Sequence, residues 1–233
     1  MDAWIAYARG PLFRVALFVC ILGLAYRIGV AAYQVIRAWL LAGDRTLPAG
    51  VIRRATLGWI FPVRLLRARP LLSVASVLFH AGILLVALFS LGHVSLWRGD
   101  LAVAWPTLAP AVCDAFAIVT AVMIASLALF RLTVRVARDL STPQDVLVLL
   151  ALLALTVSGL LASRPAYSPI GAREMLLAHI LLGDLVLVLT PATKIAHCVL
   201  FPFAQLTVEI GWHFPADTGR HVAVALAKEN ERV

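Results

Sequence analysis

Five long apolar runs constrain this chain more than any other feature. They cover roughly residues 12–36, 71–97, 108–132, 144–163 and 174–206. About 20 apolar residues in a helix cross the hydrocarbon core of a bilayer, where every backbone polar group needs an internal partner. With 62% hydrophobic and only 14% charged residues, the composition excludes an ordinary soluble domain. The sequence predicts an all-α integral membrane protein: a five-helix transmembrane bundle over residues 1–207 and a tail over residues 208–233.

The connections between the runs predict how the bundle is oriented. The first connection, the third connection and the tail together carry more than twice as many Lys and Arg residues as the opposite side. Because basic loops stay in the cytoplasm, we expect the N-terminus outside and the C-terminus in the cytoplasm. This loop distribution explains the formal charge of +8 without nucleic-acid binding. No small-residue cleavage site precedes the first run, so we expect that helix to be retained. Ser141 or Thr142 before Pro143 predicts a helix start.

Four of the six histidines lie inside two of these runs. His80 and His93 are on the second run, and His179 and His197 are on the fifth. A single histidine at membrane depth is often a packed residue bonded to a neighbouring carbonyl or hydroxyl, and this alternative stays open for each of them. Four of them on only two helices favour a functional role, because ionisable groups in a membrane are costly.

Helix geometry predicts which histidines meet. On a continuous helix, 18 residues make five full turns and about 27 Å, so His179 and His197 would share a face near opposite membrane surfaces. Spans two and five run antiparallel in the predicted bundle. We therefore expect an inner pair of His80 with His197 and an outer pair of His93 with His179.

Two stacked pairs of imidazoles suit two haem groups, each held by two axial histidines. Zinc and copper normally take three or four ligands at one level, which separations of 13 and 18 residues do not offer. The three cysteines, Cys20, Cys113 and Cys198, form no C-x-x-C-H attachment motif, so the haems would be b-type.

Two motifs resemble the gamma, cytochrome b subunit of respiratory nitrate reductases and related membrane cytochromes of reductase complexes. The second run reads "LFHAGIL" and later Gly92-His93, similar to the family's pattern. The fifth run reads His-x3-Gly-x7-Pro-x2-Lys-x2-His, with Gly183, Pro191 and Lys194. The resemblance implies two haem b groups on these histidine pairs, a quinol site beside the outer haem, and a bacterial or archaeal cytoplasmic membrane. The 13-residue separation of His80 and His93 departs from the family, so we expect either an irregular helix near Ser90–Gly92 or a displaced outer haem.

Several residues near the histidines are candidates for supporting the cofactors. Gly82 and Gly183 either admit the porphyrin or serve ordinary small-residue packing. Pro191 either kinks the fifth helix or is a tolerated membrane proline. Three basic residues lie on the predicted cytoplasmic half: Lys194, Arg131 and Arg27. Each side chain either neutralises a haem propionate or reaches toward lipid phosphate.

Two intramembrane acids, Asp184 and Asp114, are the candidate catalytic residues. Both are expected toward the outer side, where a carboxylate near the outer haem would accept a quinol proton. The alternative for Asp184 is a structural ion pair with Arg164 or Arg173.

Together these patterns predict an electron-transfer subunit rather than a complete enzyme. We expect quinol oxidation near the outer face and electron transfer inward to a cytoplasmic iron–sulfur or reductase subunit. Two alternatives stay open: a cytochrome b that reduces quinone with electrons from an extracytoplasmic donor, and a transporter or assembly protein that uses the histidines for protons or metal ions.

Overall fold

The computed structural model describes most of the chain as helix. It describes residues 1–41, 50, 53–54, 57–58, 67–103, 105–211 and 218–227. The chain divides into two compact units, and each is considered by itself. The first comprises Met1–Gly23 and Val63–Ala196, and the second comprises Leu24–Pro62 and His197–Val233.

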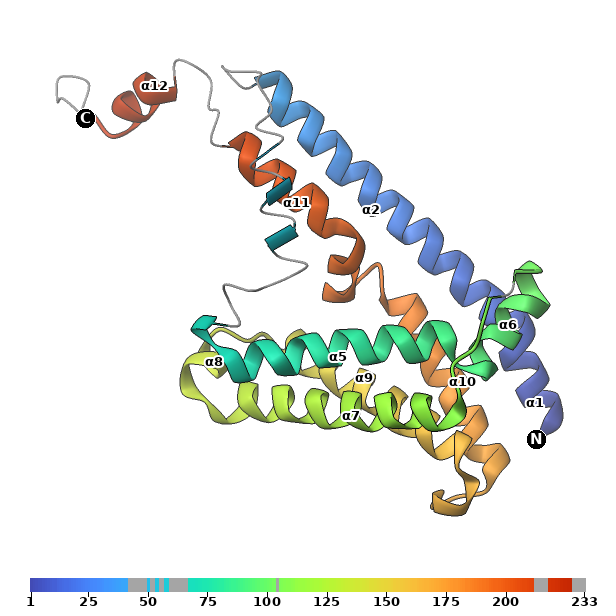
Figure 1. Ribbon diagram of the computed structural model, residues 1–233. Coiled ribbons are helices and arrows are strands. Elements are labelled where there is room, and N and C mark those ends of the chain that lie inside the picture. The colour runs from blue at the N-terminus through green and yellow to red at the C-terminus, as the bar shows by residue number, and fades with distance from the viewer. Residues whose placement is uncertain are drawn as a thin grey trace. The chain divides into compact units, whose positions relative to one another are not determined.

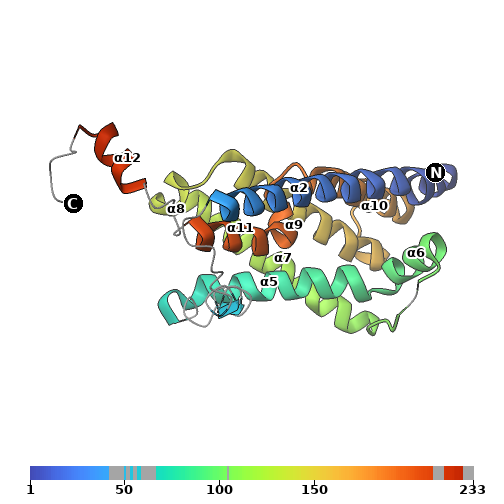
Figure 2. The same cartoon turned by 90° about the horizontal axis from the view of Figure 1, so that it is seen from above.

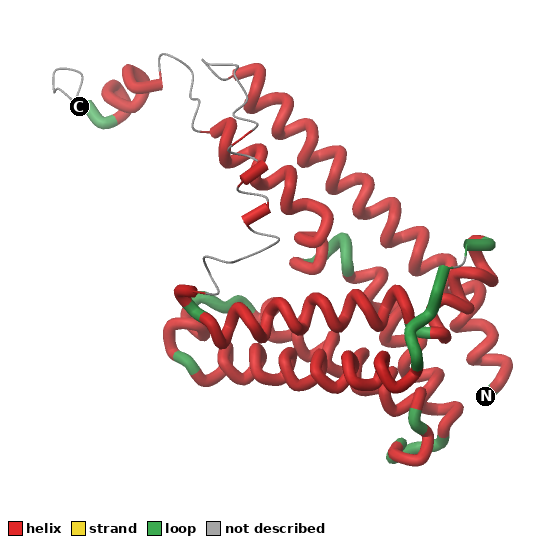
Figure 3. Tube along the Cα trace, viewed as in Figure 1, coloured by secondary structure: helices red, strands yellow, loops and turns green. Residues whose placement is uncertain are grey.

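The described part contains helices and loops and no strand (Figure 3). The α-helices are labelled in Figure 1, and their bounds are α1 Asp2–Tyr7, α2 Phe13–Leu41, α5 Pro70–Phe89, α6 Leu91–Leu101, α7 Pro110–Thr133, α8 Arg135–Asp139, α9 Pro143–Ser163, α10 Ala172–Leu189, α11 His197–Gly211 and α12 Thr218–Ala225. The shorter elements are a π-helical turn η1 at Ala8–Leu12 and two 3-10 turns, η2 at Pro165–Tyr167 and η3 at Lys194–Ala196.

Four helical stretches are long and apolar enough to cross a membrane: Asp2–Leu40, Pro70–Phe89, Pro110–Thr133 and Pro143–Ser163. The number rises to five if Ala172–Leu189 and Lys194–Ala204 count as one interrupted span. The expected all-helical, multi-pass membrane character is therefore confirmed. The five-span count and the orientation of the termini stay predictions.

The long helices begin where the sequence supplies start signals. Proline occupies the first position of α5, α7 and α9, where its missing N–H needs no partner. The predicted start at Thr142 is confirmed as a capping box, in which the Thr142 backbone N–H donates to Asp145 Oδ2 at 2.8 Å.

The first unit is organised around α7, which packs between α5 and α9, while α10 packs on α9 (Figures 1 and 2). The buried side chains of Phe79, Ile124 and Leu152 connect α5, α7 and α9 in one apolar cluster. Many other large apolar side chains are exposed, as expected where lipid surrounds a helical bundle.

The second apolar run is two helices rather than one. Ser90 has an extended backbone, with φ of −70° and ψ of 144°, and it separates α5 from α6. Its N–H donates to the Val86 carbonyl at 3.1 Å and completes the end of α5. Of the two explanations for the 13-residue histidine spacing, the structure confirms the irregular helix.

The fifth run is also interrupted, so the expectation of one continuous helix from 174 to 206 is wrong. Helix α10 ends at Leu189, and helical structure resumes at Lys194. Pro191 lies in the intervening turn, and proline can neither donate the helical hydrogen bond nor accommodate the preceding turn. Pro191 is buried, and a Cβ added at Gly23 would lie 2.6 Å from its ring, so the glycine makes room for it. The shared-face argument for His179 and His197 required an unbroken helix and therefore does not hold.

Candidate cofactor site

His93 and His179 lie against each other within the first unit. Their ring centroids are 5.9 Å apart, and the ring planes are inclined by 24°. His93 is near the start of α6, and His179 is in the middle of α10. Both side chains are half-buried. The structure thus brings together the two residues of the expected outer pair.

The interruption at Ser90 determines how His93 is oriented. Its Nδ1–H donates to the Val86 carbonyl at 3.1 Å. Seven residues of unbroken helix would separate these groups by about 10 Å along the axis, beyond the reach of the ring. Because the backbone turns at Ser90, the imidazole folds back onto the end of α5 and is fixed there.

Helix α6 also contacts the N-terminal segment of the same unit. Arg9 donates a hydrogen bond from its guanidinium to Ser95 Oγ at 3.0 Å. The rings of Phe13 and Trp97 meet edge to face, with centroids 5.7 Å apart. Ser95 and Trp97 follow His93 on α6, so these contacts restrict the movement of the short helix that carries it.

His179 receives its support from α9. Its Nδ1–H lies 3.1 Å from the Leu155 carbonyl and 3.2 Å from Ser158 Oγ, and the serine hydroxyl itself donates to the Leu155 carbonyl at 3.0 Å. A carbonyl oxygen accepts only, so Nδ1 must carry the proton. Gly159 is adjacent, and a Cβ at this position would lie 2.8 Å from the ring Cε1 of His179.

These hydrogen bonds leave both imidazoles ready to bind a metal. When Nδ1–H is held by a carbonyl, the neutral ring keeps its lone pair on Nε2, which is the usual arrangement of a metal-ligating histidine. Two imidazole nitrogens each about 2 Å from one metal place the ring centroids about 6 Å apart. The observed separation of 5.9 Å agrees with this value. Two neighbouring imidazoles, each with Nδ1–H bonded to a carbonyl, are the kind of donor set that a haem takes, so the residue types present fit that group.

The expected inner pair divides between the two units. His80 is exposed on α5, and its Nδ1–H donates to the Ser76 carbonyl at 2.7 Å, which sets the same tautomer as in His93 and His179. His197 is the first residue of α11 in the second unit. Their pairing stays a prediction, as does the role of Arg27, which is exposed on the part of α2 in the second unit.

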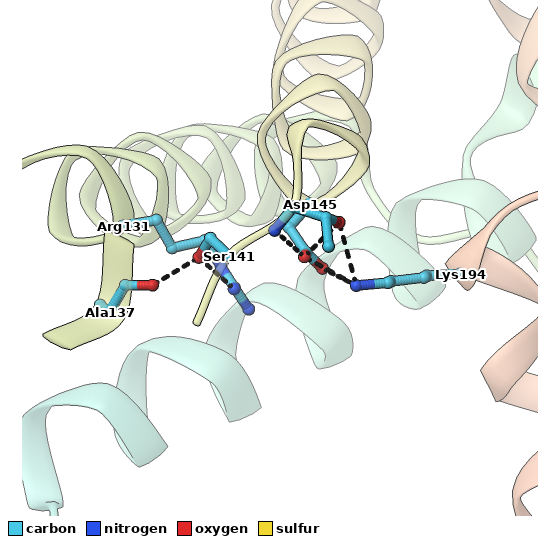
Figure 4. Close-up of polar contacts among 6 residues, drawn as sticks. Arg131, Ala137, Ser141, Asp145 and Lys194 are labelled. Carbon is cyan, nitrogen blue, oxygen red and sulfur yellow. Dashed lines mark hydrogen bonds and ion pairs between the residues drawn. The ribbon is translucent and has the colours of Figure 1, made fainter. Parts of the chain in front are cut away.

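Lys194 binds a carboxylate of the protein at the start of α9 (Figure 4). Its Nζ lies 2.8 and 2.7 Å from the two carboxylate oxygens of Asp145, and it also donates to Thr142 Oγ1 at 3.3 Å. Arg131 donates to Ser141 Oγ at 3.1 Å beside this cluster. The sequence identified both basic residues, but it did not indicate these partners. Their roles toward haem propionates stay predictions.

The two candidate acids have different surroundings. Asp114 accepts a hydrogen bond from Arg164 Nε at 2.6 Å and pairs with its guanidinium, whereas Arg173 pairs with Asp2 at 2.8 Å. Asp184 is only 5% exposed, and its Oδ2 has no hydrogen-bond partner in the described part of the chain. The alternative that Asp184 pairs with one of these arginines is therefore wrong, because both bind other carboxylates.

The two candidate glycines also differ. Gly82 faces α7, where an added Cβ would collide with Thr120 Oγ1 and lie 3.2 Å from the Phe116 carbonyl. This position serves helix packing, so the porphyrin-contact interpretation of Gly82 is corrected. A Cβ at Gly183 would find only Leu155 Cδ1, at 3.9 Å. Gly159 is the glycine whose added Cβ would contact a candidate ligand, His179. The sequence analysis missed Gly159 and Ser158; the Ser-Gly pair within an apolar run was the available signal.

Within the described ranges, no three or more His, Cys, Asp and Glu side chains gather as they would around a metal ion. The His93 and His179 pair is thus a two-imidazole arrangement.

The chain resembles a protein of Nitratidesulfovibrio vulgaris (strain Hildenborough) described only as "Protein". The two are 33% identical over 151 residues, which is 64% of this chain and 65% of that protein. The chain therefore spans slightly less than two thirds of that relative's length. No family model matches the chain. No solved structure matches it.

Proposed function

We propose that this chain is a membrane-bound b-type cytochrome that transfers electrons between the quinone pool and a partner redox subunit. The observation that carries the proposal is the facing pair of His93 and His179, with each Nδ1–H held by a backbone carbonyl. Two imidazoles of fixed tautomer, presented by separate helices with ring centroids 5.9 Å apart, form a donor set of the kind that a haem takes.

When bound, a haem supplies a one-electron carrier whose potential depends on its axial ligands and their hydrogen bonds. The protein's own residues do the remaining work. Val86, Leu155 and Ser158 bind the Nδ1 protons of the two imidazoles, so each Nε2 keeps its lone pair. A two-ligand site of this kind suits haem better than zinc, which takes three or four protein ligands.

The wider function rests on the resemblance to nitrate reductase gamma subunits. In this proposal His80 and His197 hold a second, inner haem, and quinol is oxidised near the outer one. Asp184 accepts a proton in the buried interior, and electrons pass inward to a cytoplasmic iron–sulfur or reductase subunit. The chain then resides in a bacterial or archaeal cytoplasmic membrane, and the partner subunit reduces the terminal substrate.

The absorption spectrum of the purified protein tests the proposal. We expect two low-spin b-type haems per chain in the reduced state. His93→Ala and His179→Ala should each remove the same single haem, and His197→Ala should remove the other. His221→Ala is the matched control, because His221 is exposed on α12 outside the apolar runs. A protein without low-spin haem would refute the proposal and favour a transporter or assembly role.

The direction of electron flow needs a kinetic test. If quinol is the donor, rapid mixing of the oxidised protein with quinol should reduce the haem at His93 and His179 first. If an extracytoplasmic donor instead reduces that haem and quinone is reduced afterwards, electrons flow from the donor to quinone.

A further inference from the structure

We infer that Ser158 and Gly159 on α9 are positioning residues for the axial ligand His179, and that Ser158 tunes the potential of the haem bound there. The inference rests on the proposed function. It assigns a role to a third helix, α9, which contributes no ligand of its own. Leu155, Ser158 and Gly159 are three and four residues apart, so they lie on one face of α9, which packs against α10.

Gly159 determines where the ring can lie. A Cβ at this position would be 2.8 Å from Cε1, 3.2 Å from Nδ1 and 3.3 Å from Nε2 of His179. These three atoms form one edge of the imidazole, so that edge rests against the backbone of α9. Any side chain here displaces the ring and thereby breaks its Nδ1 hydrogen bonds.

Ser158 acts on the electron density of the same ring. It is buried, and its Oγ lies within hydrogen-bond distance of both His179 Nδ1 and the Leu155 carbonyl. The imidazole N–H therefore has two acceptors. Acceptors on Nδ1–H make the ring a stronger electron donor through Nε2, which favours the oxidised metal. Losing one of the two acceptors should raise the reduction potential while the carbonyl still fixes the tautomer.

Small residues also occur at helix interfaces for packing alone, so a matched glycine is needed as a control. Gly29 on α2 is the matched helical glycine, because a Cβ there would have nothing within 4 Å. Ser126 on α7 is the matched serine, because its hydroxyl donates to the Val122 carbonyl at 2.8 Å in the same intrahelical way. Neither control touches an imidazole in the described contacts.

The experiment compares Gly159→Ala, Gly29→Ala, Ser158→Ala and Ser126→Ala in the full chain, purified from membranes. Haem content and the electron paramagnetic resonance signals of low-spin haem are measured first. Gly159→Ala should weaken binding of one haem about 10- to 100-fold, as expected for loss of a ligand's support, and leave the other haem intact. Redox titration follows: Ser158→Ala should keep both haems and shift one midpoint potential to a more positive value, whereas both controls match the wild type.

Wild-type haem content separates the two proposals. A wild type without haem overturns the proposed function and this inference with it. If both the wild type and Gly159→Ala bind two haems and their electron paramagnetic resonance signals are the same, only the inference about α9 is overturned. Should Gly159→Ala fail to fold, Ser158→Ala decides the matter, because an unchanged midpoint potential then refutes the role of α9.

Discussion

The ion pair between Lys194 and Asp145 allows a quantitative prediction. Both carboxylate oxygens of Asp145 accept from Lys194 Nζ, and Oδ2 also accepts from the N–H and the hydroxyl of Thr142. The Asp145 side chain is 12% exposed, and that of Lys194 is 52% exposed. The Asp145 carboxylate therefore caps α9 and also binds Lys194 of η3. We consider the substitutions Asp145→Asn, Asp145→Ala and Lys194→Met.

The expected magnitudes follow from these contacts. Because the lysine is half exposed, the charge pair should contribute about 1 kcal/mol, the upper part of the range for surface pairs. Asp145→Asn keeps an oxygen for the Thr142 N–H and should lose about this amount. Asp145→Ala also removes the cap and should lose about 2 kcal/mol in total, since a cap contributes about 1 kcal/mol.

A double-mutant cycle measures the pair directly. Unfolding free energies of the wild type, Asp145→Asn, Lys194→Met and the double variant would be compared in mixed micelles at low salt. We expect a coupling of about 1 kcal/mol that weakens at high salt. Additive effects of the two substitutions would refute the ion-pair reasoning. If Lys194→Met instead altered a haem spectrum that Asp145→Asn left unchanged, Lys194 would serve a propionate.

Three further substitutions test other parts of the first unit. Gly82→Ala should lower stability by about 1–2 kcal/mol, because the collision with Thr120 outweighs the gain of about 1 kcal/mol in helix propensity; equal stability in a thermal melt would contradict the packing assignment. Asp114→Asn should lower the free energy of unfolding by about 0.5–1 kcal/mol, because it weakens the ion pair with the half-exposed Arg164. Sodium chloride screens this pair, so the difference in stability between wild type and variant should be smaller at high salt. Asp184→Leu should leave the stability unchanged or raise it by up to about 1 kcal/mol, because it removes a buried polar group whose Oδ2 has no partner in the described part of the chain. The same substitution should slow the reduction of haem by quinol. Unchanged reduction kinetics would exclude the proton role.

Hydropathy predicted the class of the fold but not the interruptions within it. Hydropathy summed over about 20 residues detects an apolar span, but it does not detect a single residue with an extended backbone. Ser90 therefore left no trace in the apolar pattern, although the unusual histidine spacing pointed to it. Pro191 was visible as a possible kink, but a proline alone does not tell whether a helix bends or stops.

The candidate site was predictable only as far as its ligands. Histidines are rare and costly inside apolar runs, so their positions alone suggested the pairing of His93 with His179. Their supports are mostly backbone carbonyls, which every residue possesses and which no sequence letter distinguishes. Ser158 and Gly159 are common small residues in membrane helices, and only the arrangement of α9 beside α10 shows that they face an imidazole.

The break at Ser90 connects the fold to the proposed chemistry. At about 100° per residue, 13 residues of unbroken helix would rotate His93 about 140° away from the direction of His80. One straight helix would thus direct its two imidazoles toward different sides. By ending α5 at Phe89 and starting α6 at Leu91, the chain frees the second imidazole from the direction set by the first. It also supplies the Val86 carbonyl that fixes the imidazole's proton. In the proposed cytochrome, the interruption therefore lets His93 lie beside His179 on α10, although only 13 residues separate it from His80.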